Sequence, residues 1–186
     1  GLTYARYWVH NGYLTIHGEK MSKSLGNFRT VRELLARYPG EVLRYALLSG
    51  HYRKPLDFTP ELLEQSLHAL DRLYTTLALT ESVPAAPLDP QAAAERLGLS
   101  PERRAALTAD ALPHGLGAAP EFVAALADDL NTPQALALLH ETAALLRKDP
   151  TPERKREFLA AAGLLGLLTD TPQSWRQRLP ATGEET

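Results

Sequence analysis

Along most of the chain, leucine and alanine recur at intervals of three and four residues, which is the spacing of an amphipathic α-helix. The longest such stretch follows Thr59-Pro60, where an N-cap residue and a first-turn proline precede roughly twenty residues of helical periodicity. Three later stretches, 120–130, 133–146 and 152–165, also begin with a proline and keep this spacing. Amphipathic helices of similar length joined by short loops pack side by side, so we predict an up-and-down helical bundle.

Two shorter helices are predicted ahead of the bundle. Thr30 can cap a helix because Glu33 follows three residues later, and the helical pattern then runs to about residues 39–40. A second pattern runs from about residue 41 to residue 49, before a glycine that can end a helix. Residues 51–58 lack this periodicity and are predicted to form a loop.

The first twenty residues have a β pattern instead. Aromatic and β-branched residues cluster at 7–9 and 13–16, and two turn-forming pairs, Asn-Gly at 11–12 and His-Gly at 17–18, interrupt them. We predict short strands here, with a hairpin turn just before Lys20. Tyr7 and Trp8 are expected to pack into a core, because aromatic residues beside short strands are usually buried; stacking on adenine or another nucleotide is the alternative.

Prolines and glycines mark the remaining segments. Three prolines within residues 83–90 must end the long helix, and short helices are predicted near 91–97 and 101–109. The segment after Asp170 is polar and is predicted to be a flexible tail. The fold class is therefore mainly α. The predicted parts are a front with a β-hairpin (1–58), a helical bundle (59–170, with a linker at 83–119) and a tail (171–186).

Composition narrows the class of protein. With 186 residues, of which 44% are apolar and 23% charged, the chain can bury a core of moderate size. It contains no apolar run near the roughly 20 residues that a membrane helix needs. There is no cysteine, which excludes disulfides, thiolate nucleophiles and cysteine-ligated zinc. No secretory signal pattern is visible at the N-terminus, so we expect a cytoplasmic protein.

Charge is unevenly distributed along the chain. Residues 1–58 contain nine basic and four acidic residues, a net charge of +5, whereas the remainder contains eleven basic and eighteen acidic residues, a net charge of −7. A basic segment suits a polyanion such as ATP or an RNA backbone, and an acidic segment repels one. RNA contact is therefore expected in the front third, where His51, Arg53 and Lys54 are the candidates; a solvated loop is the alternative for these three residues.

Other polar residues have simpler interpretations. His10 and His17 lack further ligands at zinc-site spacing, so they are interpreted as ordinary turn residues and no metal site is predicted. Asp128 and Asp129 are adjacent, and neighbours on a helix point roughly 100° apart, so they do not form a catalytic or metal-binding pair. They are predicted to end a helix, with Asn131 or Thr132 capping the next one.

A loop rich in lysine and serine follows the predicted hairpin. Its sequence is Lys20-Met21-Ser22-Lys23-Ser24, and the Leu-Gly-Asn sequence after it favours a mobile loop. Two ammonium groups three residues apart can close on the oxygens of a pyrophosphate, and the serine hydroxyls can add hydrogen bonds. Such a group stabilises the charge that develops on a departing pyrophosphate. A solvated surface loop is the alternative, and the neighbouring sequence decides between the two interpretations.

These five residues match the KMSKS signature of class I aminoacyl-tRNA synthetases at every position, and the surrounding sequence resembles the C-terminal half of the cysteine-specific members, the cysteinyl-tRNA synthetases. The resemblance is strong over about residues 1–80 and good over 120–168. The segments that carry it include Ala5-Arg6-Tyr7-Trp8-Val9-His10-Asn11-Gly12, Leu25-Gly26-Asn27-Phe28, Glu41-Val42-Leu43-Arg44, His51-Tyr52-Arg53, Leu56-Asp57-Phe58 and Asp128-Asp129-Leu130-Asn131-Thr132-Pro133.

The resemblance implies roles for the loop and for the segments after it. Lys20 and Lys23 would be catalytic and would bind the phosphates of ATP, a substrate that enters with Mg²⁺, and Met21, Ser22 and Ser24 would complete the phosphate site. Residues from about 29 to 57 would form a stem-contact fold, and residues 59–168 a helical bundle on the tRNA side. The expected partners are tRNA(Cys) or the missing catalytic domain, whereas neither a membrane nor DNA is expected.

The chain also departs from the family pattern. The family's HIGH signature, its Rossmann domain and the ligands of its substrate-selecting zinc are expected before Gly1, so adenylate formation by this chain alone is not expected. Two other functions stay open. One is a truncated paralogue that binds RNA or protein without catalysis, and the other is part of a related ligase that joins cysteine to an amino-sugar thiol precursor.

Overall fold

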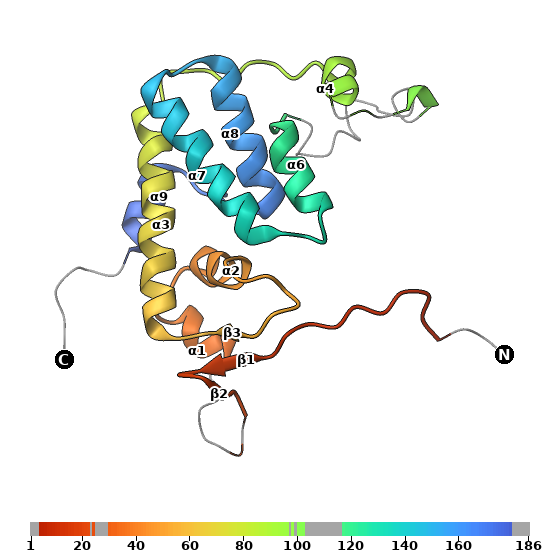
Figure 1. Ribbon diagram of the computed structural model, residues 1–186. Coiled ribbons are helices and arrows are strands. Elements are labelled where there is room, and N and C mark those ends of the chain that lie inside the picture. Colours follow the sequence, from red (N-terminus) through yellow and green to blue (C-terminus); the bar gives the residue numbers. More distant parts are fainter. Residues whose placement is uncertain are drawn as a thin grey trace.

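The computed structural model describes residues 4–22, 24, 30–96, 98, 100–102 and 117–179. Its helices are α1 (Val31–Leu35), α2 (Gly40–Leu48), α3 (Pro60–Leu79), α4 (Pro90–Arg96), α6 (Pro120–Ala127), α7 (Thr132–Lys148), α8 (Pro152–Leu165) and α9 (Pro172–Arg178). Its strands are β1 (Leu14–Ile16), β2 (Glu19–Lys20) and β3 (Leu56–Asp57). The predicted fold class is confirmed, and Figure 1 shows the small sheet at one end of the molecule and the helical bundle at the other.

Local capping explains where the helices begin. Thr30 and Glu33 form the predicted capping box: the Thr30 amide donates to Glu33 Oε2 at 2.8 Å, and the Glu33 amide donates to Thr30 Oγ1 at 3.2 Å. The side chains of Thr59, Asn131 and Thr151 cap α3, α7 and α8, each with a proline in the first turn. The bundle helices consequently begin within a residue of their predicted positions.

Three short strands form one sheet in the order β2-β1-β3, with β1 antiparallel to β2 and parallel to β3. The prediction that residues 51–58 form only a loop is wrong at Leu56 and Asp57, because these two residues pair with β1 as β3. His17 and Gly18 join β1 to β2 in a two-residue turn, and both have positive φ values, 52° and 79°. Such a turn matches the twist of a hairpin, and glycine adopts it without strain. The hairpin turn predicted before Lys20 is therefore confirmed.

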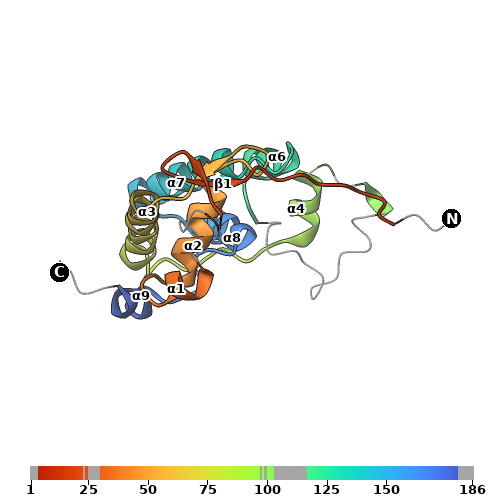
Figure 2. The same cartoon turned by 90° about the horizontal axis from the view of Figure 1, so that it is seen from below.

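No strand forms at residues 7–9, although the aromatic pattern predicted one. Aromatic residues favour strands where they pack against neighbours, and in the described chain no strand pairs with this segment. Tyr7 and Trp8 are 88% and 68% exposed, so the prediction that they pack into a core is wrong. Figures 1 and 2 show the segment running away from the sheet toward the N-terminus.

The bundle is built around α7, which packs against α3, α6 and α8. The α2 helix packs against α3 and α7 and thereby joins the front of the chain to the bundle. Fully buried side chains fill the interior; the largest include Tyr74, Phe122, Phe158, Leu70, Leu73, Leu139 and Leu146. Short loops join α6 to α7 and α7 to α8 and make these helices antiparallel neighbours, whereas the linker 83–119 separates α3 from α6.

One buried lysine connects α8 to the end of α3. Lys155 Nζ donates to the Thr80 carbonyl at 3.0 Å and to Thr80 Oγ1 at 2.9 Å, and Thr80 is the C-cap of α3. A cation at a helix C-terminus interacts favourably with the carbonyl groups that lack a helical partner. Burial lowers the pKa of Lys155, and the two acceptors on Thr80 partly offset the cost of burying its ammonium group.

The predicted tail begins with a helix, so part of that prediction is wrong. Thr171 caps α9 by accepting from the Ser174 amide at 3.1 Å, and the Trp175 side chain is fully buried. Its ring stacks on Tyr74 with centroids 4.5 Å apart, and its Nε1 donates to Asp71 Oδ1 at 3.2 Å. A single tryptophan therefore docks residues 171–179 on α3, while residues 180–186 of the predicted tail lie outside the described residues.

Only part of the linker 83–119 is described. The α4 helix lies close to the predicted helix at 91–97, and the Ala86 amide donates to the Pro152 carbonyl at 2.8 Å, which attaches the start of the linker to α8. The helix predicted at 101–109 lies outside the described residues except for its first two. Among the helices that are described, none is long and apolar enough to cross a membrane.

Candidate functional site: the lysine and serine loop and its anchor

The hairpin places Lys20 at the last position of β2, directly opposite Thr15 of β1. The Lys20 side chain is exposed, and its Nζ lies 5.6 Å from the centroid of the Tyr13 ring. An ammonium group over an aromatic face is attracted by the ring, by ~0.5–1 kcal/mol at an exposed site. Tyr13 therefore holds Lys20 at the start of the loop without neutralising its charge.

Met21 anchors the start of the loop to the sheet. Its amide donates to the Leu14 carbonyl at 2.9 Å, and its side chain lines an apolar groove of about 490 Å³ between the sheet, α1 and α2. Val31, Leu34 and Leu47 also line this groove. Because the Met21 amide is already bonded within the sheet, Met21 fixes the loop and does not offer this donor to a phosphate.

Ser22 and Ser24 bring two hydroxyl groups together beyond this anchor. Their Oγ atoms lie 3.2 Å apart; Ser24 is exposed and Ser22 is half-buried. Lys23, the second lysine of the motif, lies outside the described residues. Ammonium and hydroxyl groups are donors that phosphate oxygens accept from. The described part of the motif thus carries one ammonium and two hydroxyl groups of the kind that bind phosphate.

Asp57 stiffens the turn before Lys20 from the side of β3. Its Oδ1 accepts hydrogen bonds from Thr15 Oγ1 at 2.8 Å and from the Gly18 amide at 3.2 Å. These donors, the Gly18 amide foremost, hold the pKa of the Asp57 carboxyl below its usual value. The carboxylate is therefore ionised at neutral pH and ties the hairpin turn to β3.

Backbone contacts join the hairpin to the 51–58 loop. The Gly12 amide donates to the Tyr52 carbonyl at 2.7 Å, and the Phe58 amide donates to the Thr15 carbonyl at 2.8 Å. A Cβ atom at position 12 would lie 2.1 Å from the Lys54 carbonyl oxygen, so glycine alone allows this close approach. The lysine and serine loop is thereby attached, through β1, to the 51–58 loop.

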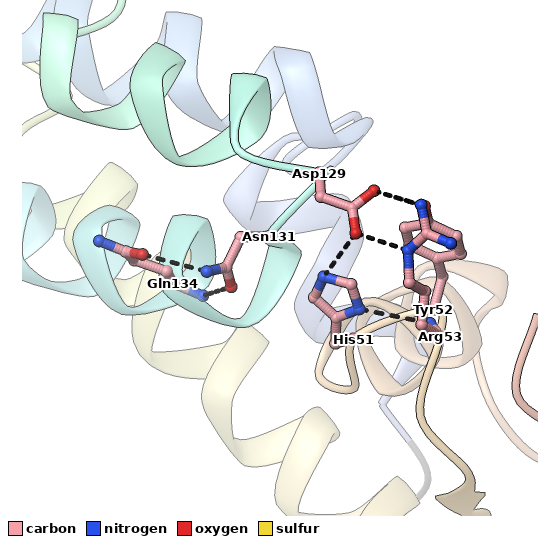
Figure 3. Close-up of polar contacts among 6 residues, drawn as sticks. All are labelled: His51, Tyr52, Arg53, Asp129, Asn131 and Gln134. Carbon is pink, nitrogen blue, oxygen red and sulfur yellow. Dashed lines mark hydrogen bonds and ion pairs between the residues drawn. The ribbon is translucent and has the colours of Figure 1, made fainter.

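The 51–58 loop is in turn bound to the bundle through Asp129, in the turn between α6 and α7 (Figure 3). Arg53 donates to both carboxylate oxygens, from Nε at 2.6 Å and from Nη2 at 2.9 Å, and the Tyr52 hydroxyl donates at 2.5 Å. His51 Nε2 lies 3.9 Å from the same carboxylate. Arg53 and then Tyr52 lower the pKa of Asp129 to about 2. We call these four residues the Asp129 clamp.

The clamp changes the interpretation of the three RNA-contact candidates. His51 and Arg53 face Asp129, whereas the Lys54 side chain is exposed to solvent in the same loop. Contact between these residues and RNA stays a prediction. Of the two other histidines considered, His17 is the first residue of the hairpin turn and His10 is exposed. Across the described ranges, no group of three or more histidine, aspartate and glutamate residues could hold a metal ion.

The two adjacent aspartates have separate roles. Asp128 is the C-cap of α6, and Asn131 caps α7 by accepting from the Gln134 amide at 3.3 Å, so both of these predictions are confirmed. The role of Asp129 in binding the 51–58 loop was missed, because Arg53 lies 76 residues away and no local pattern indicates it. The sequence gives one indication of this contact: Asp129 and Arg53 both lie in segments that carry the family resemblance.

Two family models match separate parts of the chain. Residues 1–68 match the family model for the tRNA synthetases class I (C) catalytic domain, and residues 121–170 match the DALR domain. The chain is 43% identical over 187 residues to the cysteine–tRNA ligase of Rhodospirillum rubrum, covering 98% of this chain and 34% of that protein. It is 42% identical over 189 residues to the cysteine–tRNA ligase of Xanthomonas campestris pv. campestris, covering 100% of this chain and 35% of that protein.

A solved structure also shares the fold. It is the ternary complex of Agrobacterium radiobacter K84 agnB2 LeuRS with tRNA and LeuAMS, with a TM-score of 0.51 and 21% identity, covering 83% of this chain and 20% of that chain. The fold, the KMSKS residues and the matching family model are those of a class I aminoacyl-tRNA synthetase. The relatives reported above are cysteine–tRNA ligases that align with nearly the whole chain, and the chain spans about a third of their length.

Proposed function

We propose that this chain forms the part of a cysteine–tRNA ligase that closes on the phosphates of ATP and continues into the tRNA-side helical region. In such a ligase, cysteine and ATP give cysteinyl-adenylate and pyrophosphate, and the cysteinyl group then passes to tRNA. The observation that carries the proposal is an intact KMSKS sequence at residues 20–24, within a chain that is 43% identical to such a ligase over 98% of its length.

The residues of the loop suit the triphosphate of ATP. Lys20 and Lys23 bind phosphate oxygens through their ammonium groups, and Ser22 and Ser24 donate hydrogen bonds beside them. Bound Mg²⁺ neutralises part of the triphosphate charge. When the cysteine carboxylate attacks the α-phosphate, negative charge builds up on the pyrophosphate leaving group. The two ammonium groups accelerate this step because they bind the developing charge more strongly than the ground state.

On the tRNA side, phosphate contact is assigned to Lys54 in preference to Arg53. Arg53 already donates to both oxygens of Asp129, so a carboxylate balances its charge. Lys54 lies next to it in the basic front segment, and its side chain is exposed. A lysine ammonium on a surface loop is a common phosphate ligand and carries no base specificity. The partner proposed for this face is tRNA(Cys).

The proposal is tested in a chimera in which residues 1–186 replace the matching stretch of the Rhodospirillum rubrum ligase. Cysteine-dependent exchange between ATP and pyrophosphate is measured for the chimera, for its Lys23→Ala variant and for Lys148→Ala, which removes an exposed lysine of α7. We expect exchange by the chimera, a loss of roughly 10²–10³-fold in Lys23→Ala, and no change in Lys148→Ala. The isolated chain is expected to show no exchange.

Two outcomes would count against the proposal. Exchange that is equal in Lys23→Ala and in the unchanged chimera would show that the loop does not act on the phosphates. A chimera that binds tRNA but shows no exchange would favour the non-catalytic binding module.

A further inference from the structure

The turn between α6 and α7 holds Asp129 in an unusual backbone conformation. Asp129 and Leu130 are consecutive non-glycine residues with positive φ values, 50° and 55°. L-residues rarely adopt this conformation, and such positions persist where the surrounding structure fixes them. Here the Asp128 amide donates to the Ala124 carbonyl at 2.9 Å and the Asn131 amide donates to the Ala125 carbonyl at 3.1 Å. The turn is therefore well fixed, and glycine would fit position 129 with less strain than aspartate does.

The side chain of Asp129 explains why aspartate occupies this position. Its carboxylate receives two hydrogen bonds from Arg53 and one from Tyr52 (Figure 3). The donors are themselves packed together: the His51 and Tyr52 rings stack with centroids 5.0 Å apart, and the Arg53 guanidinium lies 4.9 Å from the centroid of the Tyr52 ring. A single exposed ion pair contributes little, but a bidentate pair within such a network has a defined geometry.

A continuous series of contacts leads from the clamp to the lysine and serine loop. The Tyr52 carbonyl accepts from the Gly12 amide, β3 pairs with β1, and β1 pairs with β2, which ends at Lys20. The front of the chain is also joined to the bundle by α2, which packs on α3 and α7, by the Tyr38 hydroxyl, which donates to Glu64 Oε1 of α3 at 2.7 Å, and by the chain itself, which runs from β3 into α3. Figure 1 shows α2 between the bundle and the sheet. The clamp therefore attaches the sheet to the bundle through residues that follow α2 and precede β3.

We propose that Asp129 is a positioning residue: it fixes the 51–58 loop to the bundle and thereby sets the position of the hairpin that presents Lys20, Met21 and Ser22. Asp129 itself does not contact ATP. The effect on ATP rests on the proposed function, whereas the effect on the hairpin does not. Loss of the Asp129 carboxylate loosens the sheet at its β3 edge and leaves the interior of the bundle unchanged.

The first test measures amide hydrogen exchange on this chain for the unchanged protein, Asp129→Asn, Asp129→Gly and the control Asp128→Asn. Asparagine and glycine both tolerate the left-handed backbone, so neither variant adds strain to the turn. We expect the amides of Gly12, Met21 and Phe58, which bond across the sheet, to exchange about tenfold faster in both Asp129 variants. Asp128→Asn is expected to exchange at the rate of the unchanged protein.

The Leu70 amide, in the middle of α3, distinguishes positioning from general stability. We expect its exchange to be equal in all four proteins, because Leu70 is fully buried in the bundle core. Unchanged exchange at Gly12, Met21 and Phe58 in both Asp129 variants would overturn the proposal. Equal acceleration at Leu70 would also overturn it, because Asp129 would then support the whole fold and not the hairpin in particular.

The second test places Asp129→Asn and Asp128→Asn in the chimera and measures pyrophosphate exchange at varied ATP and varied cysteine. We expect the KM for ATP to rise about fivefold or more in Asp129→Asn, with the KM for cysteine unchanged, and both values unchanged in Asp128→Asn. An unchanged KM for ATP in an active Asp129→Asn chimera would overturn the positioning role. If the unmodified chimera shows no exchange, the proposed function fails, and hydrogen exchange still decides whether Asp129 positions the hairpin.

Discussion

Gly12 lies where the structure has no room for a side chain, because an added Cβ atom would lie 2.1 Å from the Lys54 carbonyl oxygen. We predict that Gly12→Ala lowers the free energy of unfolding by about 1–3 kcal/mol, since the backbone must move to relieve this contact. Gly40→Ala is the matched control: its Cβ would meet Leu35 Cδ2 at 3.4 Å, so we expect a change within about 0.5 kcal/mol. Urea unfolding measures both variants, and equal values would contradict the close approach of the two segments.

Asp129 gives the acid stability of the chain a predictable pH dependence. Its pKa is lowered from 3.8 to about 2 in the folded protein, where Arg53, Tyr52 and His51 face it. Between these values the folded state binds fewer protons than the unfolded state, so the free energy of unfolding rises with pH. The contribution of the clamp is complete above about pH 5 and is lost as the pH falls toward 2.

We therefore predict that the unchanged protein loses stability more steeply than Asp129→Asn between about pH 5 and pH 2. Urea unfolding at a series of pH values makes the comparison. Parallel curves for the two proteins would mean that Asp129 has a normal pKa when folded and that the clamp does not form in solution.

At the residue scale, hydrogen bonds between residues close together in the sequence could be predicted, and those between residues far apart in the sequence could not. The capping box of Thr30 and Glu33 was predictable because both partners lie within one turn of the same helix. The Asp57 carboxylate binds Thr15 42 residues away, and Asp129 binds Arg53 76 residues away. Such pairs depend on the tertiary fold, and the sequence pattern alone gave no reason to join them.

Among the elements, α9 depends on one side chain. Trp175 is fully buried against Tyr74, whereas Trp8, the other tryptophan, is 68% exposed. We predict that Trp175→Ala lowers the free energy of unfolding by about 3–5 kcal/mol, because a large aromatic group leaves the core. Trp8→Ala is the control and is expected to change it by less than about 0.5 kcal/mol. Equal losses in the two variants, measured by urea unfolding, would place α9 outside the stable fold.

The elements that could be predicted are those with a long or locally complete pattern. The bundle helices α3, α7 and α8 were predicted because each combines a capping residue, an early proline and several turns of apolar periodicity. The α9 helix is polar apart from its tryptophan, so its docking was not visible in the pattern. The aromatic residues at 7–9 met the criteria for a strand but lack a strand to pair with in the described chain.

At the scale of the whole molecule, the basic front and the acidic remainder meet at the Asp129 clamp. The front carries a net charge of +5 and the remainder −7, and Arg53 and Asp129 pair across this division. The family resemblance predicted which segments would serve ATP and tRNA, but the order of contacts from the bundle to Lys20 required the structure. The chain thus connects the proposed ATP-side loop to the proposed tRNA-side bundle through a small set of defined contacts.

The central claim is that both parts of this chain serve one ligase, and the most direct measurement is the attachment of cysteine to tRNA(Cys) by the chimera. We predict that the chimera charges tRNA and that Lys23→Ala loses charging together with pyrophosphate exchange. We also predict that Lys54→Ala keeps pyrophosphate exchange but raises the KM for tRNA several-fold, because one phosphate contact is lost. A chimera that exchanges pyrophosphate but does not charge tRNA, or one whose charging survives Lys23→Ala, would contradict the claim.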